Sequence, residues 1–182
     1  NEHCHSRIAG PDMVRQLIEL FQVPAEACEV IVYLRRQDRL AVSHYSTILK
    51  LGGTARMFPD TGSDHLPRYY DFDRLLQNYA QVVGYEKISV RLYEPAFLVG
   101  GDVVRDFYDT VGLGMTPSVT PRVNESLSLA QAIFLKHFNE RFPLVRDGKL
   151  NTERGAIFSA IQKVGTGSPF RPDRASAQSF YK

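Results

Sequence analysis

The sequence is poor in several features that identify simple classes of protein. Its 182 residues include no tryptophan and only two cysteines, Cys4 and Cys28, which cannot form the disulfide framework of a small secreted domain and suit a reducing, cytoplasmic compartment. The formal net charge is only +2, so we expect no broad basic surface for nucleic acid. The longest strongly apolar run has about five residues, which is too short to span a membrane.

The composition is that of a folded chain, with 43% hydrophobic and 23% charged residues. The length predicts one domain over residues 1–182, with a long loop at about 54–67 and a helical part at about 126–182. The sequence begins at Asn1 rather than at a methionine, so we expect further residues before it.

Two apolar segments, Glu29–Arg35 and Lys87–Tyr93, are predicted to be strands. The first is apolar on both faces, which favours a buried strand of a parallel sheet. Helices are predicted at 11–24, 38–52, 70–83, 102–111, 127–142 and 152–164. This alternation predicts an α/β fold with a parallel sheet. Two strands do not form a stable sheet alone, so we expect a further strand upstream.

Local patterns also predict the faces and ends of these helices. Apolar residues at helical spacing predict the inward face of the first helix: Met13, Leu17, Leu20 and Phe21. The same spacing places Phe72, Leu75, Leu76, Tyr79 and Val83 on one face of the helix at 70–83, and the helix at 102–111 carries Val103, Val104, Phe107 and Val111. Asp38 and Ser126 are the expected N-caps of the helices that follow them, because their side chains can accept hydrogen bonds from the first turn.

Three polar side chains follow the first strand closely in the sequence. Arg35 and Arg36 lie at its carboxyl end, where open α/β sheets bind ligands, and Ser43 lies in the next helix. A guanidinium group and a hydroxyl group in these positions can converge on one phosphate. The alternative is that the two arginines mark a solvated strand end and that Ser43 has no part in binding.

The segment from Arg35 to Ser43, in which the two residues are separated by seven others, resembles the 3′-phosphate-binding segment of sulfotransferases that use 3′-phosphoadenosine 5′-phosphosulfate (PAPS). The run Leu34-Arg35-Arg36-Gln37-Asp38 is closest to bacterial sulfotransferase-like proteins of the P-loop class. The strand ending in Tyr93-Glu94, and the following helix with Phe107 and Gly112-Leu113, resemble later segments of that family in the same order. The resemblance covers roughly residues 1–115, and the tail from Arg122 to Ser126 is similar as well.

The resemblance implies a three-layer fold like that of P-loop nucleoside-triphosphate hydrolases. It also implies transfer of a sulfuryl group from PAPS to a hydroxyl group, with a carbohydrate as the expected acceptor. The family's phosphate-binding loop normally precedes these segments, but the sequence contains no G-x-x-x-x-G-K-[ST] motif. We therefore expect the first strand and this loop to lie upstream of Asn1.

The resemblance also assigns the nucleotide-binding residues. It implies that Arg35 and Ser43 contact the 3′-phosphate of the cofactor and that Tyr93 lies near the adenine. For Tyr93 the alternative is a tyrosine of the protein core. Arg36 either supports the phosphate or pairs with a carboxylate such as Asp38.

Candidate catalytic and acceptor-binding residues complete this hypothesis. Glu2 is the first choice for the base that deprotonates the acceptor hydroxyl, and His3 is the second. His44, on the helix after the first strand, and His65, in the long loop, are candidates for acceptor binding. The loop is long enough to bind a ligand, although plain flexibility explains its composition equally well.

Two other functions remain open from the sequence. A domain of the same fold that binds a nucleotide or a protein without catalysis is the main alternative. A small-molecule kinase is the third, but it would need acidic Mg²⁺ ligands that we do not find at a strand end. We expect no metal, because His3-Cys4-His5 is not completed by a second cluster.

Overall fold

The structure is a computed structural model, and it describes residues 8–58, 68–114, 126–164, 167–168 and 170–180. The chain divides into two compact units. Unit 1 comprises Asn1–Arg36 and Thr61–Thr120, and unit 2 comprises Gln37–Asp60 and Pro121–Lys182. The prediction of one domain over residues 1–182 stays a prediction.

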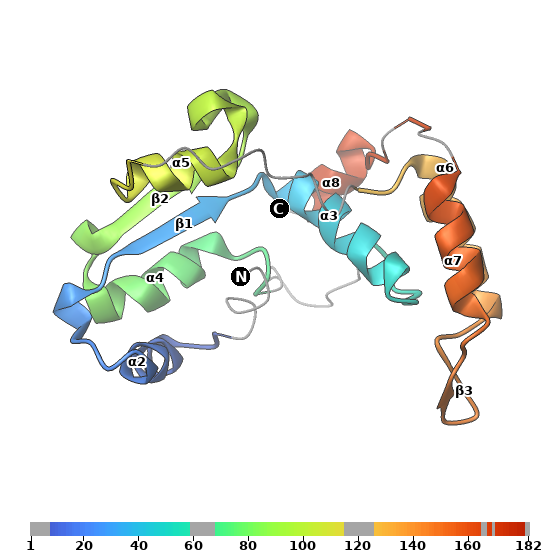
Figure 1. Cartoon of the computed structure of the whole chain (residues 1–182), viewed down its shortest axis with the longest axis horizontal. Coiled ribbons are helices and arrows are strands. Elements are labelled where there is room, and N and C mark those ends of the chain that lie inside the picture. Colours follow the sequence, from blue (N-terminus) through green and yellow to red (C-terminus); the bar gives the residue numbers. More distant parts are fainter. Residues whose placement is uncertain (1–7, 59–67, 115–125, 165–166, 169, 181–182) are drawn as a thin grey trace. The chain divides into compact units, whose positions relative to one another are not determined.

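Unit 1 contains a small parallel sheet with helices on both sides. Strands β1 (Val30–Leu34) and β2 (Ile88–Leu92) pair in parallel, with Val30 opposite Ile88 and Leu34 opposite Leu92. Helices α4 (Phe72–Val83) and α5 (Val103–Thr110) lie on opposite sides of these strands (Figure 1). Helix α2 (Pro11–Leu20) packs against α4. The predicted α/β class with a parallel sheet is therefore confirmed.

Short-range interactions set the ends of the unit 1 helices. The Asp71 side chain accepts a hydrogen bond from the Arg74 backbone N–H at 3.0 Å, so α4 begins at Phe72 rather than at Tyr70. Gly84 ends α4 with φ = 89°, a conformation that disfavours any residue with a Cβ. Short 3₁₀ turns, η1 to η4, occupy Ala25–Ala27, Tyr85–Lys87, Pro95–Phe97 and Val99–Gly101.

Burial in unit 1 differs from the sequence prediction. All five residues of β1 are half-buried rather than buried, because this strand and β2 make up the whole parallel sheet in the described part of the chain. In α2 the buried residue is Val14, whereas Leu20 is 79% exposed. In α5 Phe107 and Val111 are exposed, and the buried side chain is Asp106. In α4, by contrast, Leu75 and Val83 of the face that helical spacing predicts are buried.

Unit 2 is mainly helical. It contains α3 (Gln37–Lys50), α6 (Leu129–Arg141), α7 (Arg154–Lys163) and α8 (Arg174–Phe180). Strands β3 (Val145–Arg146) and β4 (Lys149–Leu150) form an antiparallel hairpin that the sequence analysis missed, as it missed α8. The core of unit 2 is formed by α3, α6 and the residue before the α6 cap: Tyr45, Leu49, Leu127, Ala132, Leu135 and Phe138.

Two predicted N-caps of unit 2 helices are wrong. Helix α3 begins at Gln37, so Asp38 lies in its first turn. Helix α6 is capped by Ser128, not Ser126, because the Ser128 hydroxyl accepts from the Gln131 N–H while the Gln131 side chain accepts from the Ser128 N–H. This reciprocal pair is a capping box, which requires Gln or Glu three residues after the cap; Ser126 has Leu129 there.

A buried arginine joins the end of α6 to α7. Arg154 is 6% exposed and donates hydrogen bonds to the Phe142 carbonyl and, at 2.6 Å, to the Asn139 side-chain oxygen. Its guanidinium carbon lies 5.0 Å from the centre of the Phe138 ring. Asn139 in turn donates to the Leu49 carbonyl at 2.9 Å. Burial lowers the pKa of Arg154 below its ordinary value.

Candidate nucleotide-binding site

The carboxyl end of the parallel sheet brings together Arg35 and Tyr93, which the sequence analysis assigns to nucleotide binding. Each lies just after a strand, and the Tyr93 N–H continues the ladder by donating to the Leu34 carbonyl at 2.8 Å. The guanidinium carbon of Arg35 lies 5.6 Å from the centre of the Tyr93 ring, within the range of a cation–π contact. Arg35 is half-buried and Tyr93 is 40% exposed. We call this pair the Arg35–Tyr93 stack.

The Asp106 carboxylate, on α5, is the second feature of this part of unit 1. Asp106 is fully buried and accepts hydrogen bonds from three segments of the chain. The Tyr33 hydroxyl donates to Oδ1 at 2.7 Å, Arg91 donates through Nε to Oδ1 and through Nη2 to Oδ2 at 2.7 Å, and the Val99 N–H donates to Oδ2 at 3.0 Å. Both carboxylate oxygens therefore have two donors each.

These donors determine the ionisation of the group. The hydrogen bonds from Arg91, supported by those from Tyr33 and Val99, hold the pKa of the Asp106 carboxyl well below its ordinary value, against the opposing effect of burial. Burial and the hydrogen bond to Asp106 raise the pKa of the Tyr33 hydroxyl. The carboxylate is therefore charged at neutral pH, where it pairs with Arg91.

The remaining predicted residues do not all fall in unit 1. Arg36 is exposed and lies next to Arg35. Ser43 and His44 are half-buried on α3, in unit 2, where the Ser43 carbonyl accepts from the Thr47 hydroxyl at 3.1 Å. Convergence of Ser43 with Arg35 on one phosphate stays a prediction. Glu2, His3 and His65 lie outside the described residues.

A second hollow in unit 1 lies at the other end of the sheet. Its volume is about 760 Å³. It is lined by the amino-terminal residues of both strands, the turn before β2 and the last turn of α5: Glu29, Val30, Ile31, Glu86, Lys87, Ile88, Ser89, Phe107, Thr110 and Val111. Its lining includes none of the predicted site residues.

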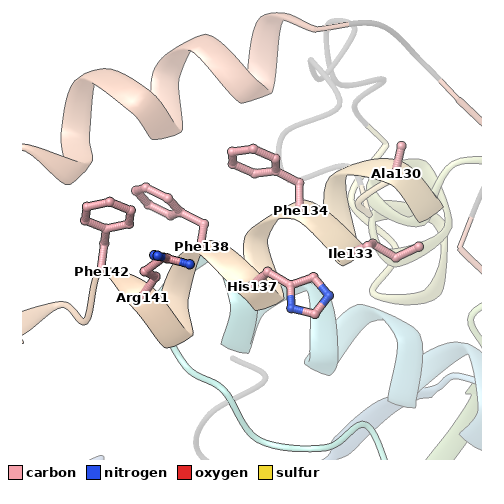
Figure 2. A pocket seen from close by; sticks show the side chains of 7 residues that line it. All are labelled: Ala130, Ile133, Phe134, His137, Phe138, Arg141 and Phe142. Carbon is pink, nitrogen blue, oxygen red and sulfur yellow. The ribbon is translucent and has the colours of Figure 1, made fainter.

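Unit 2 has an apolar groove of about 580 Å³ along α6. Figure 2 shows Phe134, Phe138 and Phe142 on the same side of this helix. Their rings stack in series, with centres 5.9 Å apart for the first pair and 5.1 Å apart for the second. The other lining residues are Ala130, Ile133, His137 and Arg141. Apart from the imidazole of His137 and the guanidinium of Arg141, the lining side chains are apolar.

The described residues contain neither a metal-binding cluster nor a helix that could span a membrane. Within these ranges no three His, Cys, Asp or Glu side chains gather where they could hold a metal ion. None of the helices described combines the length and the apolar character needed to cross a bilayer.

Comparisons with known proteins identify one distant relative. An uncharacterized protein of Archaeoglobus fulgidus is 27% identical over 118 residues, which cover 64% of this chain and 32% of that protein. The match thus spans about a third of the relative's length. No family model matches the chain, and no solved structure matches it.

Arg35 and Tyr93 were predicted from the sequence, but Asp106 was not. One pattern could have indicated it. Arg91 is a charged residue in a strand that is mainly apolar, and Asp106 is a charged residue one turn after Val103, among the apolar residues of α5. Opposite charges on two inward-facing elements that follow each other predict a buried ion pair.

Proposed function

We propose that this chain belongs to a sulfotransferase of the P-loop class that moves a sulfuryl group from PAPS to a hydroxyl group of a carbohydrate or other small acceptor. The observation that supports it best is the Arg35–Tyr93 stack at the carboxyl end of a parallel sheet. Ligands of open α/β sheets bind at this edge. A guanidinium group offers forked donors to a phosphate, and an exposed aromatic ring offers a flat surface to adenine.

In this proposal the chain's residues have three roles: they bind the nucleotide, deprotonate the acceptor hydroxyl and contact the acceptor. Arg35 and Ser43 hold the 3′-phosphate of the donor, with Arg36 in support, and Tyr93 packs against the adenine. Glu2, or else His3, accepts the proton of the acceptor hydroxyl as its oxygen attacks sulfur. The bond between sulfur and the 5′-phosphate oxygen then breaks, and 3′-phosphoadenosine 5′-phosphate leaves.

The contacts to the acceptor are the third role. His44 and His65 are the proposed contacts, because imidazole can donate to or accept from a sugar hydroxyl. No metal takes part in the proposal.

The first experiment is calorimetry with two nucleotides that differ by one phosphate. The intact protein should bind 3′-phosphoadenosine 5′-phosphate far more tightly than adenosine 5′-phosphate. Arg35→Ala should weaken binding of the former by roughly tenfold or more, because a hydrogen bond to a charged group contributes about 1.5–3 kcal/mol. Arg15→Ala, which removes an exposed arginine on α2, is the matched control. Equal affinities for the two nucleotides would refute the assignment.

The second candidate is a non-catalytic nucleotide-binding domain of the same fold. It is supported by the same stack, which binds but performs no chemistry. A sulfate-transfer assay with labelled PAPS and a panel of sugars separates the two candidates. Tight nucleotide binding without transfer by the intact protein would favour the second.

A further inference from the structure

The Asp106 carboxylate accepts hydrogen bonds from both strands, at positions two residues before those of the Arg35–Tyr93 stack. Tyr33 and Arg91 are register partners in the parallel pair. Both donate to Asp106, so one carboxylate fixes the two side chains relative to each other.

The position of the Arg35–Tyr93 stack follows from that of Tyr33 and Arg91, because side chains repeat every two residues along a β-strand. Side chains two residues apart in a strand point to the same face. Arg35 lies two residues after Tyr33, and Tyr93 lies two residues after Arg91. The backbone bond from Tyr93 to Leu34 extends the ladder to this position. The stack is therefore the next cross-strand pair beyond the one that Asp106 clamps.

The carboxylate also holds the chain that leaves β2. The Val99 N–H donates to Asp106 Oδ2, so the segment between Tyr93 and Val99 is fixed at both ends. Asp106 itself is rigidly placed, because α5 begins four residues earlier at the cap Asp102, whose side chain accepts from the Val104 N–H at 2.9 Å.

We propose that Asp106 is a positioning residue for the Arg35–Tyr93 stack: by binding Tyr33, Arg91 and the Val99 N–H together, it sets the distance between the Arg35 guanidinium and the Tyr93 ring. A role of Asp106 in nucleotide binding rests on the proposed function. Its role in positioning the stack does not depend on that function.

NMR of the full chain tests the stack directly. Nuclei held over an aromatic ring are shifted upfield, so the side-chain resonances of Arg35 should carry such a shift, and Tyr93→Leu should remove it. We expect Asp106→Asn to abolish the shift in a chain that stays folded, because the amide replaces an acceptor of Arg91 with a donor. Asp109→Asn, which changes an exposed carboxylate on the same helix, should leave it intact. An unchanged Arg35 shift in folded Asp106→Asn would overturn the proposal.

A milder variant covers the case in which Asp106→Asn does not fold. Tyr33→Phe removes only the donor from β1 and should reduce the Arg35 shift. A Tyr33→Phe chain with the full shift would then overturn the positioning role.

Calorimetry with 3′-phosphoadenosine 5′-phosphate separates this inference from the proposed function. If both hold, Asp106→Asn binds roughly tenfold more weakly than Asp109→Asn, as for loss of one charged contact. If the unmodified chain binds no nucleotide but Arg35 still loses its shift in Asp106→Asn, the proposed function fails and the positioning role is supported. If Asp106→Asn binds as tightly as Asp109→Asn in a chain that does bind, the role in nucleotide binding is refuted.

Discussion

Replacing the buried Arg154 by methionine should strongly destabilise unit 2. Methionine fills much of the same space but donates no hydrogen bond. The Asn139 side-chain oxygen and the Phe142 carbonyl would each lose a donor that they have in the structure. The cation–π contact with Phe138 would be lost as well.

The size of the effect follows from these contacts. A buried acceptor left without its donor costs about 1–3 kcal/mol, and a desolvated cation–π contact contributes up to about 2 kcal/mol. Part of this loss is recovered, because the variant no longer has to remove a guanidinium group from water. We therefore expect the free energy of unfolding to fall by about 2–4 kcal/mol.

Urea denaturation followed by circular dichroism measures this loss, since unit 2 is mainly helical. Arg146→Met is the matched control, because Arg146 is exposed on β3 and its replacement should change stability by less than about 0.5 kcal/mol. Equal stability of the two variants would show that the cost of burying the guanidinium cancels its hydrogen bonds, and the reasoning would be refuted.

Three further predictions concern other parts of the chain. Ser128→Ala should cost about 1 kcal/mol of stability by removing the cap of α6, whereas Ser126→Ala should cost less than about 0.5 kcal/mol, both measured by urea denaturation. The pKa of Asp106 is lower in the folded chain than its ordinary 3.8, so its stabilising effect is full above that pH and is lost as the pH falls toward the folded value. Denaturation at about pH 5 and about pH 3 should show a larger loss in the natural sequence than in Asp106→Asn, where only other carboxylates such as Asp173 contribute. Glu2→Gln should lower sulfate transfer by about 10²–10⁴-fold with nucleotide affinity unchanged, and His3→Asn should do less; the reverse order would make His3 the base.

The sequence predicted the elements of unit 1 well because each depends on neighbours in the chain. Apolar runs located β1 and β2, and Gly84 marked the end of α4. The hairpin of unit 2 was also local: its turn is Asp147-Gly148, a pair suited to the positive φ angles of 52° and 74° found there. It was missed because each of its strands has only two residues, which gives no alternation to recognise.

Buried faces were harder to predict because they depend on what packs against each element. Phe107 and Val111 are large apolar residues four positions apart, but the structure leaves both exposed and buries Asp106. An aspartate is buried there because four donors from β1, β2 and η4 satisfy it, and those donors are distant in the sequence. Hydrophobicity alone cannot predict such a residue.

The candidate site likewise combines residues that local motifs identify with a contact that depends on distant parts of the chain. Motifs identified Arg35 and Tyr93 separately, but their contact depends on the register between β1 and β2. The apolar residues of β1 do not specify that register, because this strand is apolar on both faces. The hydrogen bonds from Tyr33 and Arg91 to Asp106 do specify the register. Tyr33 and Asp106 are 73 positions apart, and a one-residue slip would turn the Arg91 side chain to the other face of the sheet, away from Tyr33 and Asp106. The pairing that forms the candidate site is therefore encoded in a polar contact between distant residues, which is why the sequence motifs alone could not predict it.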